Sequence, residues 1–214
     1  MKTKFLLLAV FCVIAIAANA QFSIGVKGGL NVSSIEEFGP YSLDAKAGFN
    51  AGIMAQYMFS KNIGIESGLY YSLMGGKEKE KDYDNPNRID DYKASANPSY
   101  LQVPLYAIYK FNLSEDLRLY PSLGIYLGYG LNGKIDIKGI DDGADITMKD
   151  DFFNDDNNRF DIGAGAGFNI QYKKVVFGFG YEQGFMKINK HDFPYDDENA
   201  YNSNFKLSVG FLIN

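Results

Sequence analysis

Apolar and polar residues alternate at a period of two along most of the chain after residue 21, the pattern of β-strands with two different faces. In RFDIGAGAGFNIQY (159–172), phenylalanine, isoleucine, alanine and tyrosine alternate with aspartate, glycine, asparagine and glutamine. One face of each such segment is apolar, and the other carries glycine, small polar residues and occasional charges. The alternation predicts eight strands, over 22–33, 47–59, 63–74, 99–111, 117–131, 159–172, 175–187 and 204–214.

The glycine-rich second face indicates what kind of sheet these strands form. The exposed face of a soluble sandwich would be rich in Lys, Glu and Thr, whereas glycine suits the cramped interior of a small closed barrel. The segments are also long enough for tilted transmembrane strands, which need about 9–11 residues. A soluble lipocalin-type barrel is the structural alternative, and it would turn the apolar face inward. We predict an all-β fold, an eight-stranded antiparallel up-and-down transmembrane β-barrel with its apolar face outward.

The connections between the predicted strands alternate in length. Three are short (60–62, 112–116 and 173–174) and four are long (34–46, 75–98, 132–158 and 189–203). The long connections hold 21 of the 26 acidic residues and ten basic ones. Outer-membrane barrels have short periplasmic turns and long extracellular loops. We therefore expect an integral protein of a Gram-negative outer membrane, with both termini in the periplasm and acidic loops outside.

Aromatic residues on the apolar face gather at the two ends of the predicted strands, where a membrane barrel carries its interfacial girdles. Next to the short turns lie Phe22, Tyr57, Phe59, Tyr109, Phe111, Tyr172, Phe177 and Phe211. Near the long loops lie Phe49, Tyr71, Tyr129, Phe160 and Phe205.

The N-terminal segment MKTKFLLLAVFCVIAIAANA has two lysines, an apolar stretch and a final Ala-Asn-Ala, which predicts a secretory signal peptide over 1–20. The barrel domain is then 21–214, and Cys12, the single cysteine, leaves with the signal. No disulfide is expected in the mature chain. Without Lys2 and Lys4 it has 19 basic and 26 acidic side chains, a net charge of −7. Nucleic acid is therefore not an expected partner, because binding it requires a basic face.

The stretch YLQVPLYAIYKF (100–111) carries a resemblance to a known family. Its first five residues, Tyr100, Leu101, Gln102, Val103 and Pro104, resemble the Tyr-Leu-Glu/Gln-Ile/Val-Pro strand of PorT-like outer-membrane β-barrel proteins from Bacteroidetes-type bacteria, and FSIGVKGGLN after the predicted signal is similar to that family's first strand. The resemblance implies an eight-stranded outer-membrane barrel. It also implies that a role in secretion of surface proteins, known for some members, is one option for this chain.

Pro104 lies in the middle of a predicted strand, although proline cannot donate a ladder hydrogen bond and is usually confined to sheet edges. A closed barrel has no edge, so we expect Pro104 to interrupt a ladder on the lumen side. If the turn 112–116 pairs Phe111 with Leu117, Pro104 lies opposite Gly124. Water or a side chain would then satisfy the carbonyl group left without a partner.

Seven charged residues fall on the inward face, four positive and three negative: Lys27, Glu66, Lys110, Arg118, Asp161, Glu182 and Lys206. An eight-stranded barrel is about filled by its own side chains, which favours a nearly neutral, salt-bridged structural plug over a selectivity ring in a channel. Because an unpaired buried ion is costly, we expect Glu66 to meet Lys27 or Arg118.

Signals for other chemistry are weak. His191, Asp192 and Ser203 are the only grouping that could serve a hydrolase at the barrel rim, and no nucleophile motif accompanies them. The segment DDGADITMKDD (141–151) has oxygen ligands but lacks the spacing of an EF-hand, so a solvated disordered loop is favoured over a calcium site. No Walker-type loop, dinucleotide fingerprint or HExxH motif is present, so no cofactor or metal is predicted.

The sequence favours a non-enzymatic outer-membrane protein with a role in surface interaction, the envelope or secretion. A narrow channel or carrier for small solutes is the main alternative, and a rim-located hydrolase is a further one. The expected partners are outer-membrane lipid and lipopolysaccharide, the barrel-assembly machinery during insertion, and an extracellular or secretion-system protein.

Overall fold

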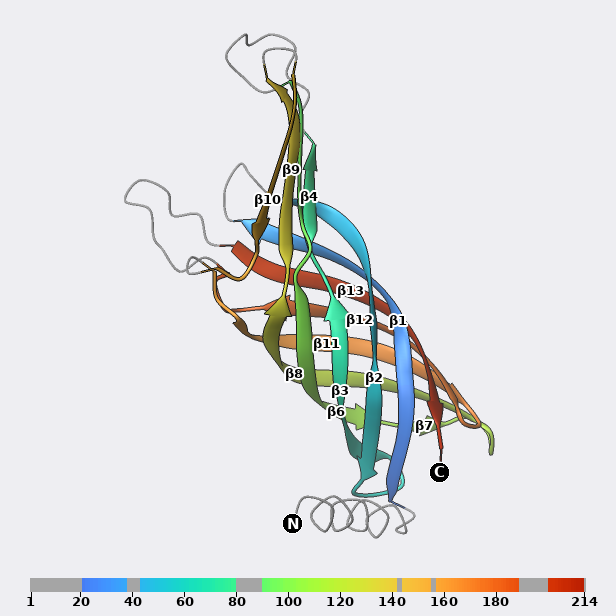
Figure 1. Cartoon of the computed structure of the whole chain (residues 1–214). Helices are drawn as coiled ribbons and strands as arrows, with labels where there is room; N and C mark the ends of the chain where they lie inside the picture. Colours follow the sequence, from blue (N-terminus) through green and yellow to red (C-terminus); the bar gives the residue numbers. More distant parts are fainter. Residues whose placement is uncertain are drawn as a thin grey trace, which may run out of the picture.

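Eight strands of the computed structural model pair with their neighbours in sequence, and the last returns to pair with the first (Figure 1). The structure describes residues 21–37, 43–79, 90–141, 144–154, 157–188 and 200–213. The closed antiparallel barrel predicted from the sequence is therefore confirmed. Its strands are β1 (Phe22–Glu37), β2 (Leu43–Met58), β3 (Ile63–Leu73), β6 (Ser99–Tyr109) with its short continuation β7 (Phe111–Asn112), β8 (Leu117–Asn132), β11 (Phe160–Tyr172), β12 (Val175–Gly184) and β13 (Ala200–Leu212).

The barrel closes through β1, which pairs with β2 on one side and β13 on the other. Val26 is in register with Ile53 of β2 and with Phe211 of β13. These three side chains share the outward face, because paired residues of an antiparallel sheet point to the same side. A closed sheet leaves no unpaired strand edge in the barrel wall, as a membrane-spanning sheet requires.

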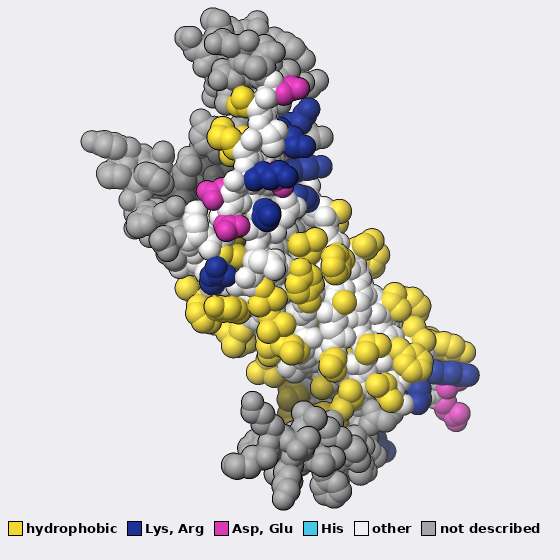
Figure 2. All heavy atoms as spheres, in the orientation of Figure 1, with side chains coloured by type: hydrophobic (Ala, Val, Ile, Leu, Met, Phe, Trp, Pro, Cys, Tyr) yellow, Lys and Arg dark blue, Asp and Glu magenta, His cyan; other side chains and the backbone are white. Residues whose placement is uncertain are grey.

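Strand alternation separates an apolar exterior from a polar interior. On β8, Leu123 is 66% exposed, whereas Tyr120, three residues earlier, is 0% exposed. Apolar side chains cover the middle of the barrel face seen in Figure 2, with charged side chains above and below them, and exposed apolar residues on every long strand of the barrel make this an apolar belt. The predicted girdle aromatics are exposed except for Phe22, which is half-buried. Within the described part of the chain, no helix is long and apolar enough to span a membrane.

The long connections were predicted to be loops. They also contain a second sheet, which continues beyond the barrel (Figure 1). Its strands are β4 (Gly76–Lys79), β5 (Asp90–Ala96), β9 (Lys134–Asp141) and β10 (Ala144–Asp151), in the order β2-β4-β5-β9-β10. The barrel strands β1, β2 and β13 also extend further toward this end than expected. We call this second sheet the extension and name the two ends of the barrel the long-loop end and the turn end.

The extension forms because its strands alternate as the barrel strands do. Ile135 and Ile137 of β9 lie on one face, and Lys134, Asp136 and Lys138 lie on the other. The lower part of the apolar face packs on a buried cluster at the long-loop end, since Ile135 contacts it. That cluster consists of Ile35, Met74, Ala96, Tyr100, Phe152, Phe153, Ile188 and Ala200. Burial of this apolar surface ties the extension to the barrel.

The predicted register of Pro104 is wrong by two residues. Pro104 pairs with Tyr126, and Gly124 lies opposite Tyr106. The turn is centred on residue 115 and not on residue 114 as expected, since the backbone N–H of Leu113 bonds the carbonyl of Leu117 at 2.9 Å. Pairing therefore continues past Phe111, which meets Leu119 rather than Leu117.

Pro104 does face the lumen and does interrupt a ladder. Pairing between β3 and β6 is broken between Ser67 and Tyr70, the stretch of β3 that faces Pro104. The Ser67 hydroxyl donates to the Pro104 carbonyl at 2.6 Å. A side chain thus satisfies a carbonyl at the point where proline has no N–H to offer.

Candidate functional site: the polar lumen and its two ends

Glu66 of β3 is buried in the lumen, where three donors meet its carboxylate. The Lys27 ammonium lies 2.9 Å from Oε1, and the Gln56 amide donates to Oε2 at 2.7 Å. The Tyr120 hydroxyl also donates to Oε2, at 3.3 Å. These contacts join four strands of the barrel wall. Of the two partners that the sequence suggested for Glu66, Lys27 and Arg118, it is Lys27 that forms the ion pair.

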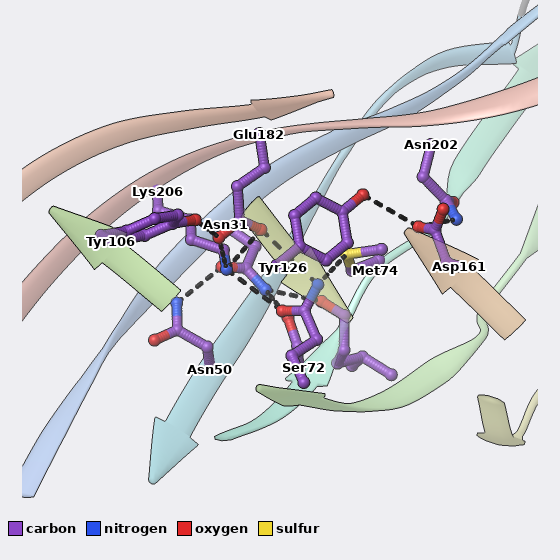
Figure 3. Close-up of polar contacts among 12 residues, drawn as sticks. Asn31, Asn50, Ser72, Met74, Tyr106, Tyr126, Asp161, Glu182, Asn202 and Lys206 are labelled. Carbon is purple, nitrogen blue, oxygen red and sulfur yellow. Dashed lines mark hydrogen bonds and ion pairs between the residues drawn. The ribbon is translucent and has the colours of Figure 1, made fainter. Parts of the chain in front are cut away.

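A second ion pair, nearer the long-loop end, joins β12 and β13 (Figure 3). The Lys206 ammonium lies 2.6 Å from each carboxylate oxygen of Glu182. The Tyr106 hydroxyl donates to the same carboxylate at 2.7 Å, and the Gln102 carbonyl accepts from Lys206 at 3.1 Å. Tyr106 and Gln102 belong to β6, so this cluster spans the barrel.

Asp161 of β11 is buried, and no described cation forms an ion pair with it. Its Oδ2 accepts from the Tyr126 hydroxyl at 2.9 Å and from the Asn202 amide at 3.0 Å (Figure 3). Its Oδ1 has no hydrogen-bond partner among the described residues. The sequence predicted that Asp161 would take part in a salt-bridged plug, but neutral donors hold its carboxylate instead.

A layer of amides and hydroxyls links the walls without charge. The Asn31 amide donates to the Ser72 hydroxyl at 2.9 Å, and the Asn50 amide donates to the Asn31 carbonyl at 2.6 Å (Figure 3). All three side chains are buried. These residues hold β1, β2 and β3 together through side chains in addition to the backbone ladder.

Toward the turn end the lumen charges are positive. The Lys110 ammonium donates to the amide oxygens of Gln56 at 2.7 Å and Gln171 at 3.0 Å, and it lies 5.1 Å from the centre of the Tyr120 ring. Arg118 makes no hydrogen bond or ion pair within the described part of the chain. The seven predicted charges are therefore divided between two ion pairs, one carboxylate with neutral partners, and two cations without a carboxylate.

Two cavities lie inside the barrel at different depths. The inner one has a volume of about 60 Å³ and lies between the ion pairs, with Lys27, Glu66, Glu182 and Lys206 in its lining. A cavity of this size holds only a few water molecules. The other, of about 790 Å³, opens at the turn end and is lined by Lys110 and Arg118 among others.

Sequence reasoning missed the inward tyrosines, which fill much of the lumen: Tyr70, Tyr100, Tyr106, Tyr120 and Tyr126. Their even-numbered positions on strands already predicted would have placed them inside. Glycines make room for the rings, since a Cβ at Gly124 would lie 2.8 Å from Cδ1 of Tyr106. A Cβ at Gly163 would lie 2.5 Å from Cε1 of Tyr126. The glycine-rich inner face therefore accommodates tyrosine rings from neighbouring strands.

The strand motif 100–104 contributes to both faces of the wall. Tyr100 is buried and its ring meets Phe153 edge-on at 5.5 Å, while Gln102 contacts the second ion pair. Pro104 lines the inner cavity. Leu101 and Val103 face outward, at 36% and 41% exposure. The motif is thus part of the barrel construction and brings no reactive group.

Of the three candidates for a hydrolase at the rim, only Ser203 lies within the described residues. Ser203 is buried in β13, with its hydroxyl 2.9 Å from that of Ser34, while His191 and Asp192 lie outside the described residues. The acidic segment 141–151 was expected to be a disordered loop, but its described residues belong to the end of β9 and to β10. Among the described residues, no three His, Cys, Asp or Glu side chains are grouped to hold a metal ion.

A closed eight-stranded barrel with an apolar belt and a polar lumen defines an integral membrane β-barrel. The chain belongs to the outer membrane protein beta-barrel domain family, whose model matches residues 17–190. It is therefore an outer-membrane β-barrel protein. No curated protein sequence matches the chain.

Solved structures of similar shape include three outer-membrane proteins. Ail, the attachment invasion locus protein of Yersinia pestis, is 15% identical, with a TM-score of 0.47, and the match covers 90% of this chain and 99% of that one. Neisserial surface protein A is 16% identical (TM-score 0.40, covering 88% and 96%). OprG from Pseudomonas aeruginosa is 14% identical (TM-score 0.42, covering 89% and 95%). These likenesses concern the barrel shape alone.

Proposed function

We propose that this protein is a non-conducting outer-membrane barrel that presents its extension at the cell surface for interaction with other molecules. The observation that carries the proposal is the combination of a lumen crossed by side chains with an ordered sheet beyond the membrane belt. A conducting channel needs an open, water-filled lumen instead.

The lumen contacts support the absence of a conducting path. Glu66 and Gln56 both contact the Tyr120 hydroxyl inside the lumen, and the Tyr106 hydroxyl reaches Glu182. Between these layers there is space for only about 60 Å³. Hydrated ions do not fit through such a layer unless these hydrogen bonds break, so the polar network acts as a structural plug.

The extension supports the surface role because its outer face is charged and its strands are held in register. Lys93 of β5 pairs with Lys138 of β9, which pairs with Thr147 of β10, and all three side chains are exposed. Lys and Arg side chains gather over this part of the molecule in Figure 2. Such a face suits contact with lipopolysaccharide phosphates or with an anionic surface partner.

This role requires the long-loop end to face outward, with the N- and C-termini in the periplasm. The PorT-like resemblance is consistent with that orientation. It also suggests a second role for the extension, in which it assists the secretion of surface proteins. As for other outer-membrane barrels, insertion would depend on the barrel-assembly machinery.

Single-cysteine labelling tests the orientation, because the predicted mature chain has no cysteine of its own. Thr147→Cys lies in β10 of the extension, and Ser114→Cys, the matched control, lies in the turn between β7 and β8; both residues are exposed. In intact cells, a membrane-impermeant maleimide should label the first variant and should label the second only after the outer membrane is permeabilised. Labelling in the reverse order would refute the surface role.

Planar-bilayer recording tests the plug. The purified protein should give no stable conductance, whereas reproducible single-channel steps in the wild type would establish the channel alternative and overturn the proposal. A porin recorded in the same bilayers provides the positive control.

A further inference from the structure

The cavity at the turn end is a cationic vestibule, by which we mean the luminal space of about 790 Å³ lined by Lys61, Lys110, Arg118, Lys173 and Lys174. Ser23, Asn112 and Gln171 contribute polar groups to the same lining, and none of its described residues is Asp or Glu. Its volume is in the range of small-molecule sites, about 300–1,000 Å³. The vestibule lies at the opposite end of the barrel from the extension.

The charge in the vestibule is largely uncompensated. Lys173 is 3.7 Å from Asp116, an exposed pair that contributes little, and Lys174 donates to the carbonyl of Ile213 at 2.7 Å. Lys61 and Arg118 make no ion pair or hydrogen bond within the described part of the chain. Their positive charges are thus available to a ligand.

Glu66, the nearest buried carboxylate in the lumen, does not neutralise the vestibule. It lies deeper, where Lys27 is bound to it at 2.9 Å, and it is absent from the vestibule lining. Lys110, at the floor, is held by the amide oxygens of Gln56 and Gln171. Amide oxygens fix the position of an ammonium group but leave its net charge in place.

The sheet register brings donors into one row. Arg118 of β8 pairs with Asn112 of β7 on one side and with Gln171 of β11 on the other. Side chains of paired residues share a face and lie about 5 Å apart at Cβ. All three line the vestibule, so a guanidinium is flanked by two amides on a single stretch of wall.

We propose that this vestibule binds a soluble small molecule bearing a phosphate group. A guanidinium presents a planar fork of donors that matches phosphate oxygens, and lysine ammonium groups add point charges around it. A divalent anion gains from every cation of the lining, and the amides and the Ser23 hydroxyl can bond the rest of the molecule. Because Lys110, Arg118 and Gln171 occupy inward positions of the barrel wall, the ligand enters from solution.

Calorimetry on the mature chain in phosphatidylcholine nanodiscs tests this site, with inorganic pyrophosphate as the probe. Pyrophosphate should bind at one site and more weakly as salt increases. Arg118→Gln should reduce the affinity roughly tenfold, because one charge-assisted contact is lost, and Arg118→Lys should recover part of it. Arg118 has no hydrogen-bond or ion-pair partner among the described residues, so these variants should keep the heat-modifiable gel shift of a folded barrel. Lys149→Gln, on the extension, is the matched control and should bind as the wild type does.

Three results would overturn the proposal. The first is no binding by the wild type, and the second is equal affinity of the wild type and Arg118→Gln. The third is equal binding of citrate, which would show that the vestibule takes any multivalent anion. If phosphatidylglycerol in the nanodiscs abolished pyrophosphate binding, the ligand would be a lipid headgroup, which would refute the soluble source. None of these measurements depends on the extension, so the proposed surface role can fail or hold independently.

Discussion

Removal of the Glu66 carboxylate should destabilise the barrel by about 3 kcal/mol, the low end of the roughly 3–5 kcal/mol that breaking a buried ion pair costs. At the 2.9 Å separation from Lys27, the attraction at an effective dielectric constant near 20 is about 6 kcal/mol, and desolvation of both groups offsets much of it. Glu66→Ala leaves Lys27 unpaired and two neutral donors, Gln56 and Tyr120, without their acceptor. The Lys27 side chain is 14% exposed beside the inner cavity, which lets water relieve part of the loss.

Urea unfolding in detergent micelles, followed by circular dichroism, measures this effect. Glu66→Ala should lower the free energy of unfolding by about 3 kcal/mol, whereas the double variant Lys27→Met with Glu66→Gln should stay within about 1 kcal/mol of the wild type. The double variant removes both charges and keeps an acceptor for Gln56 and Tyr120. An unchanged midpoint for Glu66→Ala, or a double variant as unstable as the single one, would refute the ion-pair reasoning.

Two further predictions concern the outer belt and the long-loop end. Leu123→Arg, on the apolar belt at 66% exposure, should cost about 2–4 kcal/mol in a bilayer. Leu113→Arg, in the turn at 58% exposure, should cost less than about 1 kcal/mol, and equal unfolding midpoints in lipid vesicles would argue against the membrane placement of the belt. Arg159 donates to the carbonyls of Gly130, Leu131 and Phe153, so Arg159→Ala should cost about 1–3 kcal/mol locally. Limited proteolysis should then cleave the 133–158 region faster while the barrel keeps its gel shift, and an unchanged cleavage rate would contradict this role.

The alternation of residues predicted most of the barrel wall because it is a local property. In β11, each apolar residue is separated from the next by one small or polar residue, and the pleat sends them to opposite faces. Outward positions such as Leu123 and inward ones such as Glu66 could therefore be assigned without knowing which strand pairs with which. The chain's division into short turns and long connections follows from the same reading.

Register was not predictable in the same way. One turn centred a residue later than predicted, and stabilised where the Leu117 N–H donates to the Ser114 hydroxyl at 3.1 Å, moved the partner of Pro104 from Gly124 to Tyr126. A shift of two residues keeps every side chain on its predicted face, so the alternation cannot reveal it. The extension was missed for a related reason, because β5 and β9 pair across more than thirty residues of chain.

The lumen shows most clearly what the sequence alone can predict and what it cannot. The sequence determined that seven charges point inward, since each lies on the polar face of its strand. Only the closed barrel decided that Lys27 meets Glu66 across β2, that tyrosine rings lie over glycines, and that Lys110 and Arg118 face a wide cavity. The physical reason is that facing in or out is set by the covalent geometry of one strand. Contact across the lumen instead depends on how eight strands are staggered when the sheet closes.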